Sequence, residues 1–149
     1  VVVFLDSAEA RKQVKPLTGV EMAQEKRQFL PGLLVVPVGT EVLFPNRDSV
    51  RHHVYSFSPA KKFELKLYSG TPSNPVLFDK AGVVALGCNI HDQMVGTVVV
   101  VDTPLFGRTD AGGQLVLDLP AVCALGRALP PAAHRPMPTW PRCRASRCA

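Results

Sequence analysis

The segment GCNIHDQMVG (87–96) gathers three side chains that can ligate a metal ion. Cys88, His91 and Met94 follow one another at intervals of three, although the chain has only four cysteines, four histidines and three methionines. Thiolate, imidazole and thioether groups are soft or borderline donors that suit copper, whereas Ca²⁺ and Mg²⁺ prefer oxygen. Zinc accepts Cys and His but seldom Met. The segment therefore predicts a copper site in a tight loop between two strands.

A fourth ligand must come from another part of the chain. The segment SVRHHVYSFS (49–58) offers His52 and His53 near the start of a strand. Either one would complete two imidazoles, a thiolate and a weak axial thioether, the ligand set of a blue-copper electron-transfer site. Strand alternation leaves the choice open, because His53, Tyr55 and Phe57 also make a plausible inward face. Each residue alone has an ordinary structural explanation, such as a buried cysteine, but their coincidence favours the metal site.

Short apolar runs bounded by turn residues must position these side chains. No long stretch has a 3.6-residue period, so the pattern predicts an all-β protein, an antiparallel Greek-key β-sandwich. Residues 7–13 and 20–29 are the only segments that could form a helical turn or two. The predicted strands lie at residues 1–5, 33–38, 41–45, 53–57, 76–78, 83–87, 97–101 and 114–119.

The composition changes after Pro120. Residues 121–149 contain five prolines, no acidic residue and no strand alternation, and such a segment buries too little to offset its ordering entropy. We therefore predict one β-sandwich domain over residues 1–120 and a disordered, irregular tail over residues 121–149. Cys143, Cys148 and His134 belong to this biased tail, and we assign them no role.

The charge distribution argues against nucleic-acid binding. Five of the 17 basic residues lie in the tail, so the 12 others are matched by all 12 acidic residues of the chain. A neutral body without a basic stripe does not fit a phosphate backbone. No apolar run approaches the roughly 18 to 20 residues of a membrane span, and we predict none.

Two segments carry a resemblance to a known family. VGTEVLFPNRDSVRHHVYSFS (38–58) and VLFDKAGVVALGCNIHDQMVGTVVVVD (76–102) resemble the cupredoxins, in particular the amicyanin, pseudoazurin and plastocyanin group and the methylamine utilisation proteins. The resemblance implies that Cys88 is the thiolate, His91 the second imidazole and Met94 the axial thioether. It places His52 on the upstream ligand position and His53 on a neighbouring position where relatives have Asn. One ion would cycle between Cu(I) and Cu(II).

The resemblance implies a periplasmic one-electron carrier, not an enzyme. Its expected partners are a dehydrogenase or other reductant and a c-type cytochrome or oxidase, and we expect a monomer. Catalysis is disfavoured because four protein ligands leave no open position for a substrate. Two alternatives remain: a copper-binding or delivery module without sustained electron transfer, and a metal-free accessory β-sandwich.

Overall fold

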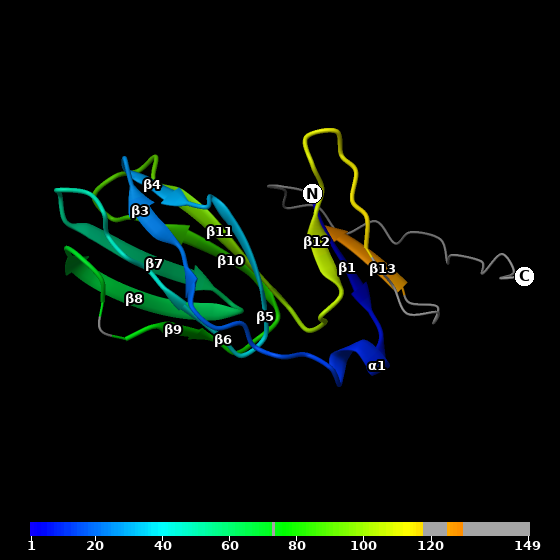
Figure 1. The fold of residues 1–149 in the computed structure, drawn as a ribbon. Coiled ribbons are helices and arrows are strands. Elements are labelled where there is room, and N and C mark those ends of the chain that lie inside the picture. Colours follow the sequence, from blue (N-terminus) through cyan, green and yellow to red (C-terminus); the bar gives the residue numbers. More distant parts are fainter. Residues whose placement is uncertain (73, 118–124, 130–149) are drawn as a thin grey trace, which may run out of the picture. The chain divides into compact units, whose positions relative to one another are not determined.

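The computed structural model describes residues 1–72, 74–117 and 125–129 (Figure 1). The described residues form two compact units, one of residues 15–101 and the other of residues 1–14 together with the described residues from 102 onward.

The larger unit contains a five-stranded sheet and a three-stranded sheet. Non-consecutive strands are neighbours in both sheets, as in a Greek-key arrangement, and the parallel pairs β5·β11 and β2·β6 lie beside antiparallel ones. The predicted all-β Greek-key sandwich is confirmed. In spatial order the five-stranded sheet is β5 (Leu33–Pro37), β11 (Val95–Val101), β10 (Gly82–Gly87), β7 (His52–Ser58) and β8 (Lys61–Tyr68). The three-stranded sheet is β2 (Val20–Glu21), β6 (Thr40–Leu43) and β9 (Val76–Phe78).

The hydrophobic core of this unit draws on both sheets. Along β10 the pattern alternates, because Val84 and Leu86 are buried while Val83 and Ala85 are exposed. Central strand β11 is buried along most of its length, since β5 and β10 flank it. The cluster consists of Met22, Phe29, Val36, Val42, Phe44, Val54, Val76, Phe78, Val84, Leu86, Cys88, Met94, Val98 and Val100.

A separate hairpin, β3 (Ala23–Glu25) and β4 (Gln28–Leu30), corrects the expected helical turns at residues 20–29. Its turn is made by Lys26 and Arg27, with φ of 54° and 57°. Such left-handed pairs form the tight turns of two-residue hairpins, and without Gly or Asn the sequence gives little sign of one. The hairpin packs against β11 at Gly96, where a β-carbon would lie 3.0 Å from both Met22 Cε and Phe29 Cβ.

The smaller unit has a three-stranded sheet in the order β12 (Phe106–Arg108), β1 (Val2–Asp6), β13 (Leu125–Leu129). Helix α1 (Ala8–Arg11) follows β1, and the Ser7 hydroxyl accepts a hydrogen bond from the Ala10 N–H at 3.0 Å. The helical turn expected at residues 7–13 is therefore confirmed.

The structure differs from the sequence prediction in two segments near the C-terminus. Residues 114–117 contain no strand, so the strand expected at 114–119 is wrong for the part that is described. Residues 125–129 of the predicted irregular tail form a strand that pairs antiparallel with β1. The rest of the tail lies outside the described residues. The boundary of one domain at residue 120 stays a prediction.

Among the described residues, no helical segment combines the length and hydropathy that a bilayer crossing requires.

Candidate metal centre

Cys88 is positioned by strands β10 and β11. These strands pair antiparallel from Gly82↔Val100 to Gly87↔Val95, and the chain between them forms a short loop. Cys88 is the first residue of that loop and is buried. The Met94 N–H donates to the His91 carbonyl at 2.9 Å and closes the loop at its other end. The loop is therefore tight, as the sequence predicts.

His52 reaches this loop because β7 and β10 are antiparallel neighbours with Gly87 opposite Tyr55. The start of β7 therefore lies beside the end of β10. His52 is the first residue of β7 and its side chain is 0% exposed. Its Nδ1 lies 3.8 Å from Cys88 Sγ.

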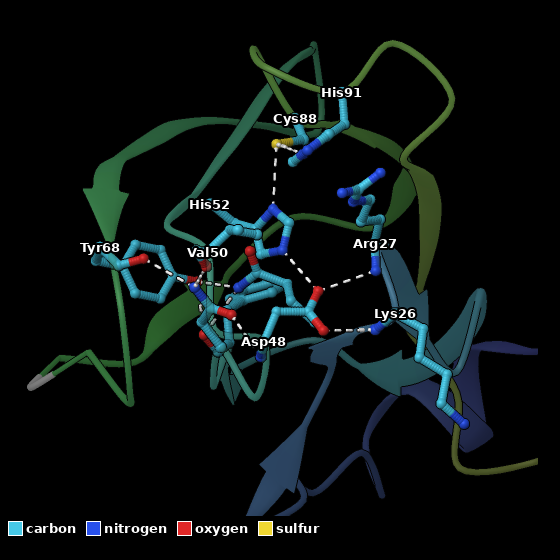
Figure 2. A network of polar contacts seen from close by, with 11 residues as sticks. Lys26, Arg27, Asp48, Val50, His52, Tyr68, Cys88 and His91 are labelled. Carbon is cyan, nitrogen blue, oxygen red and sulfur yellow. Dashed lines mark hydrogen bonds and ion pairs between the residues drawn. The ribbon is translucent and has the colours of Figure 1, made fainter.

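The ring of His91 approaches the same sulfur from the loop. Its Nδ1 is also 3.8 Å from Cys88 Sγ, and the two imidazole centroids are 5.0 Å apart. The sulfur and one nitrogen of each ring lie within 4.8 Å of one another (Figure 2). Two donors bound at about 2.0 and 2.3 Å to one ion can be at most about 4.3 Å apart, and both sulfur–nitrogen distances satisfy this limit. The donor chemistry of this cluster, two imidazoles and one thiol, fits one soft or borderline metal ion.

The other two candidate ligands have different surroundings. His53 Nε2 lies 2.8 Å from Glu64 Oε1 on β8, so its ring is held by that strand. The structure thus brings His52, and not its neighbour, to Cys88 and His91. Met94 is buried in the same hydrophobic cluster as Cys88, and its role as an axial ligand stays a prediction.

The backbone just before Cys88 is covered by an aromatic ring. A β-carbon built on Gly87 would lie 2.8 Å from both Cζ and the hydroxyl oxygen of Tyr55. A side chain at position 87 would therefore require the Tyr55 ring, which is only half-buried, to move away from the end of β10.

No family model and no curated protein matches the chain, but solved structures do. An oxidised methionine-to-leucine variant of amicyanin is 21% identical, with a TM-score of 0.51 over 68% of this chain and 100% of that one. The copper-containing nitrite reductase from Thermus scotoductus SA-01 is 23% identical, with a TM-score of 0.52 over 65% of this chain. The chain has the cupredoxin fold.

These likenesses establish the fold alone. The chain spans only 27% of the length of the nitrite reductase. A purple cupredoxin from Nitrosopumilus maritimus is 26% identical over 55% of this chain and 99% of that one, with a TM-score of 0.48.

Asp48 also lies at the site, although the sequence did not predict a role for it. Asp48 Oδ2 lies 2.7 Å from Nε2 of His52, on the side of the ring opposite Cys88 (Figure 2). The Asp48 N–H donates to Asn46 Oδ1 at 3.0 Å. Asn46 Nδ2 in turn donates to the carbonyls of Val50 and Tyr68 at 2.8 and 2.9 Å.

The surroundings of Asp48 favour its ionised form. Burial by itself raises the pKa of the carboxyl, but hydrogen bonds from the Arg27 N–H, from His52 and from the Lys26 N–H outweigh burial and lower the pKa below its ordinary value. The only sequence signal was an acidic residue four positions before a histidine, which is too common to identify such a pair.

Proposed function

We propose that this chain is a blue copper protein that carries single electrons, with one copper ion held by His52, Cys88, His91 and Met94. The observation that supports the proposal best is the convergence of two Nδ1 atoms on one buried thiol at 3.8 Å each. When bound, copper supplies a one-electron couple between Cu(I) and Cu(II).

The choice of copper follows from the donor set. Two imidazoles and a thiolate would also accept zinc, but a buried thioether at the end of the same loop favours copper. Four protein ligands would leave no position for a substrate, which favours a carrier over an enzyme.

The backbone that carries the metal-binding side chains suits electron transfer. Cys88 directly follows a central strand, His52 begins the neighbouring strand, and the turn that contains His91 is closed by the Met94 N–H. Because each donor is attached to a paired or hydrogen-bonded backbone, the site would need little rearrangement when an electron arrives or leaves.

The surface beside the site suits a short-lived encounter with a redox partner. His91 is half-buried, and the apolar side chains of Ile90 and Val95 in the same loop region are 49% and 68% exposed. A small apolar contact would permit binding and rapid release. We propose a monomer in the periplasm that accepts electrons from a dehydrogenase or other reductant and passes them to a c-type cytochrome or oxidase.

Titration of the purified chain with Cu(II), followed by absorption and electron paramagnetic resonance spectra, tests this function. The wild type should turn intensely blue with one equivalent of copper. Cys88→Ser should abolish the colour, since it removes the thiolate.

The neighbouring histidines supply a matched pair of variants for the same titration. His52→Gln should lose the blue site, whereas His53→Gln should keep it, because His53 faces Glu64. A chain that holds only Cu(I) and is not reversibly reoxidised would instead be a copper-delivery module. A chain that takes up no copper would be an accessory β-sandwich.

A further inference from the structure

We infer that Asp48 is a positioning residue of the proposed copper site, one that holds His52 in the form that presents a lone pair to the metal. The inference rests on the proposed function. Asp48 Oδ2 and His52 Nε2 are 2.7 Å apart, the length of a strong charge-assisted hydrogen bond.

The carboxylate is held from its other side by the β3–β4 turn. The Lys26 N–H donates to Oδ1 at 2.7 Å and the Arg27 N–H donates to Oδ2 at 2.9 Å (Figure 2). The left-handed conformation of Lys26 and Arg27 lets two successive N–H groups face the same carboxylate. Asp48 thereby ties the hairpin to the site.

These contacts determine which nitrogen of His52 carries the hydrogen. Backbone N–H groups donate to both oxygens of Asp48, which favours the ionised carboxylate, and this group can only accept from Nε2. A neutral ring with hydrogen on Nε2 has its lone pair on Nδ1, the atom that lies 3.8 Å from Cys88 Sγ. Because the His52 side chain is fully buried, no bulk water competes for this role.

The negative charge has a second consequence. A carboxylate bonded to the far side of an imidazole makes the near nitrogen a better donor. A stronger donor and a nearby negative charge favour the more highly charged Cu(II) over Cu(I). Asp48 therefore lowers the reduction potential.

An amide cannot replace this carboxylate. In the variant Asp48→Asn, an amide oxygen in the place of Oδ2 would leave the NH₂ group opposing the Lys26 N–H. With the amide oxygen in the place of Oδ1, the NH₂ group would face Nε2 and force the hydrogen of His52 onto Nδ1, toward Cys88. The variant therefore loses a hydrogen bond or the useful tautomer.

The first test uses the copper-free protein. Long-range ¹H–¹⁵N correlation spectra at neutral pH report which imidazole nitrogen carries the hydrogen. We expect His52 in the Nε2–H form in the wild type and in Glu64→Gln, which removes the carboxylate partner of His53 instead. Asp48→Asn should lose or mix this form. A wild-type His52 with its hydrogen on Nδ1 would overturn the inference.

The second test uses copper, with affinity measured by chelator competition and potential by voltammetry. Asp48→Asn should bind Cu(II) about 10 to 100 times more weakly. If the affinity for Cu(II) falls ten times more than the affinity for Cu(I), the reduction potential rises by about 59 mV. Glu64→Gln should change neither quantity. An Asp48→Asn protein with wild-type affinity and potential would overturn the inference.

Failure of Asp48 and failure of the proposed function give different results. A wild type that takes up no copper refutes the carrier, while the tautomer of His52 still tests the positioning by Asp48. Should Asp48→Asn not fold, Asp48→Glu keeps the charge and should retain the Nε2–H form. In that case the wild-type spectrum decides, because absence of the Nε2–H form from the wild type overturns the inference by itself.

Discussion

Replacing Gly96 by alanine should destabilise the larger unit by about 1–3 kcal/mol, the usual cost of overpacking a core. The added β-carbon would lie 3.0 Å from Met22 Cε and 3.0 Å from Cβ and Cδ2 of Phe29. Carbon atoms pack best at about 3.5–4.0 Å. The thioether end of Met22 can rotate away, but Phe29 Cβ is attached to the backbone of β4. Relief therefore requires the backbone of β4 to shift by a few tenths of an ångström away from β11.

Urea unfolding followed by circular dichroism measures this effect. With a denaturant slope of about 2 kcal/mol/M, a loss of about 2 kcal/mol lowers the midpoint by about 1 M. Gly32→Ala is the matched control, because its β-carbon would meet only the Phe29 carbonyl oxygen, at 3.8 Å. That variant should stay within about 0.5 kcal/mol of the wild type. Equal midpoints for the two variants would refute close packing of the hairpin on β11.

Three further predictions follow from burial and donor chemistry. Phe78→Ala should cost about 3–5 kcal/mol in urea unfolding because the ring is fully buried, whereas Phe57→Ala, at 78% exposure, should cost no more than about 0.5 kcal/mol. Met94→Leu should keep the blue absorption and raise the reduction potential in voltammetry, since Cu(II) loses an axial donor; an unchanged potential would exclude axial ligation. Burial, aided by the Cys88 charge and opposed by a hydrogen bond from Gln24, raises the pKa of Tyr68 from 10.0 to about 12. Its contribution to stability is therefore complete below pH 10.0 and is lost as the pH rises through about 12. An ultraviolet titration of Tyr68→Phe should lack this late phenolic step, and persistence of the step would contradict the assignment.

The sequence was sufficient for the fold class and for two of the residues that meet at the site, Cys88 and His91. Apolar runs such as those of β10 and β11 alternate or are wholly apolar over strand length, so both strands and the loop between them were predictable. The resemblance to the cupredoxins placed His52 on the upstream ligand position, whereas strand alternation alone did not decide between His52 and His53. The large aromatic side chains of Tyr55 and Phe57 suggested an inward face, but neither is buried, whereas Val54 and Ser56 are. Both His52 and His53 are buried, and the pairing of β7 with β8 is irregular between His52 and Val54, so simple alternation does not separate the two histidines.

The errors have specific physical causes. Strand β8 was missed because the predicted strands were all apolar runs, and β8 contains none: Phe63 and Leu65 alternate with charged residues, which is the pattern of a partly buried edge strand. The β3–β4 hairpin was missed because neither Lys26 nor Arg27 signals a left-handed turn. Asp48 was missed because its importance depends on two N–H groups that lie more than 20 residues away along the chain.

The contact between Tyr55 and Gly87 joins two positions that the sequence holds far apart. A methyl group at position 87 would lie too close to the phenol, so a larger residue there requires either a smaller residue at position 55 or a rotated Tyr55 ring. The two positions should therefore covary through evolution.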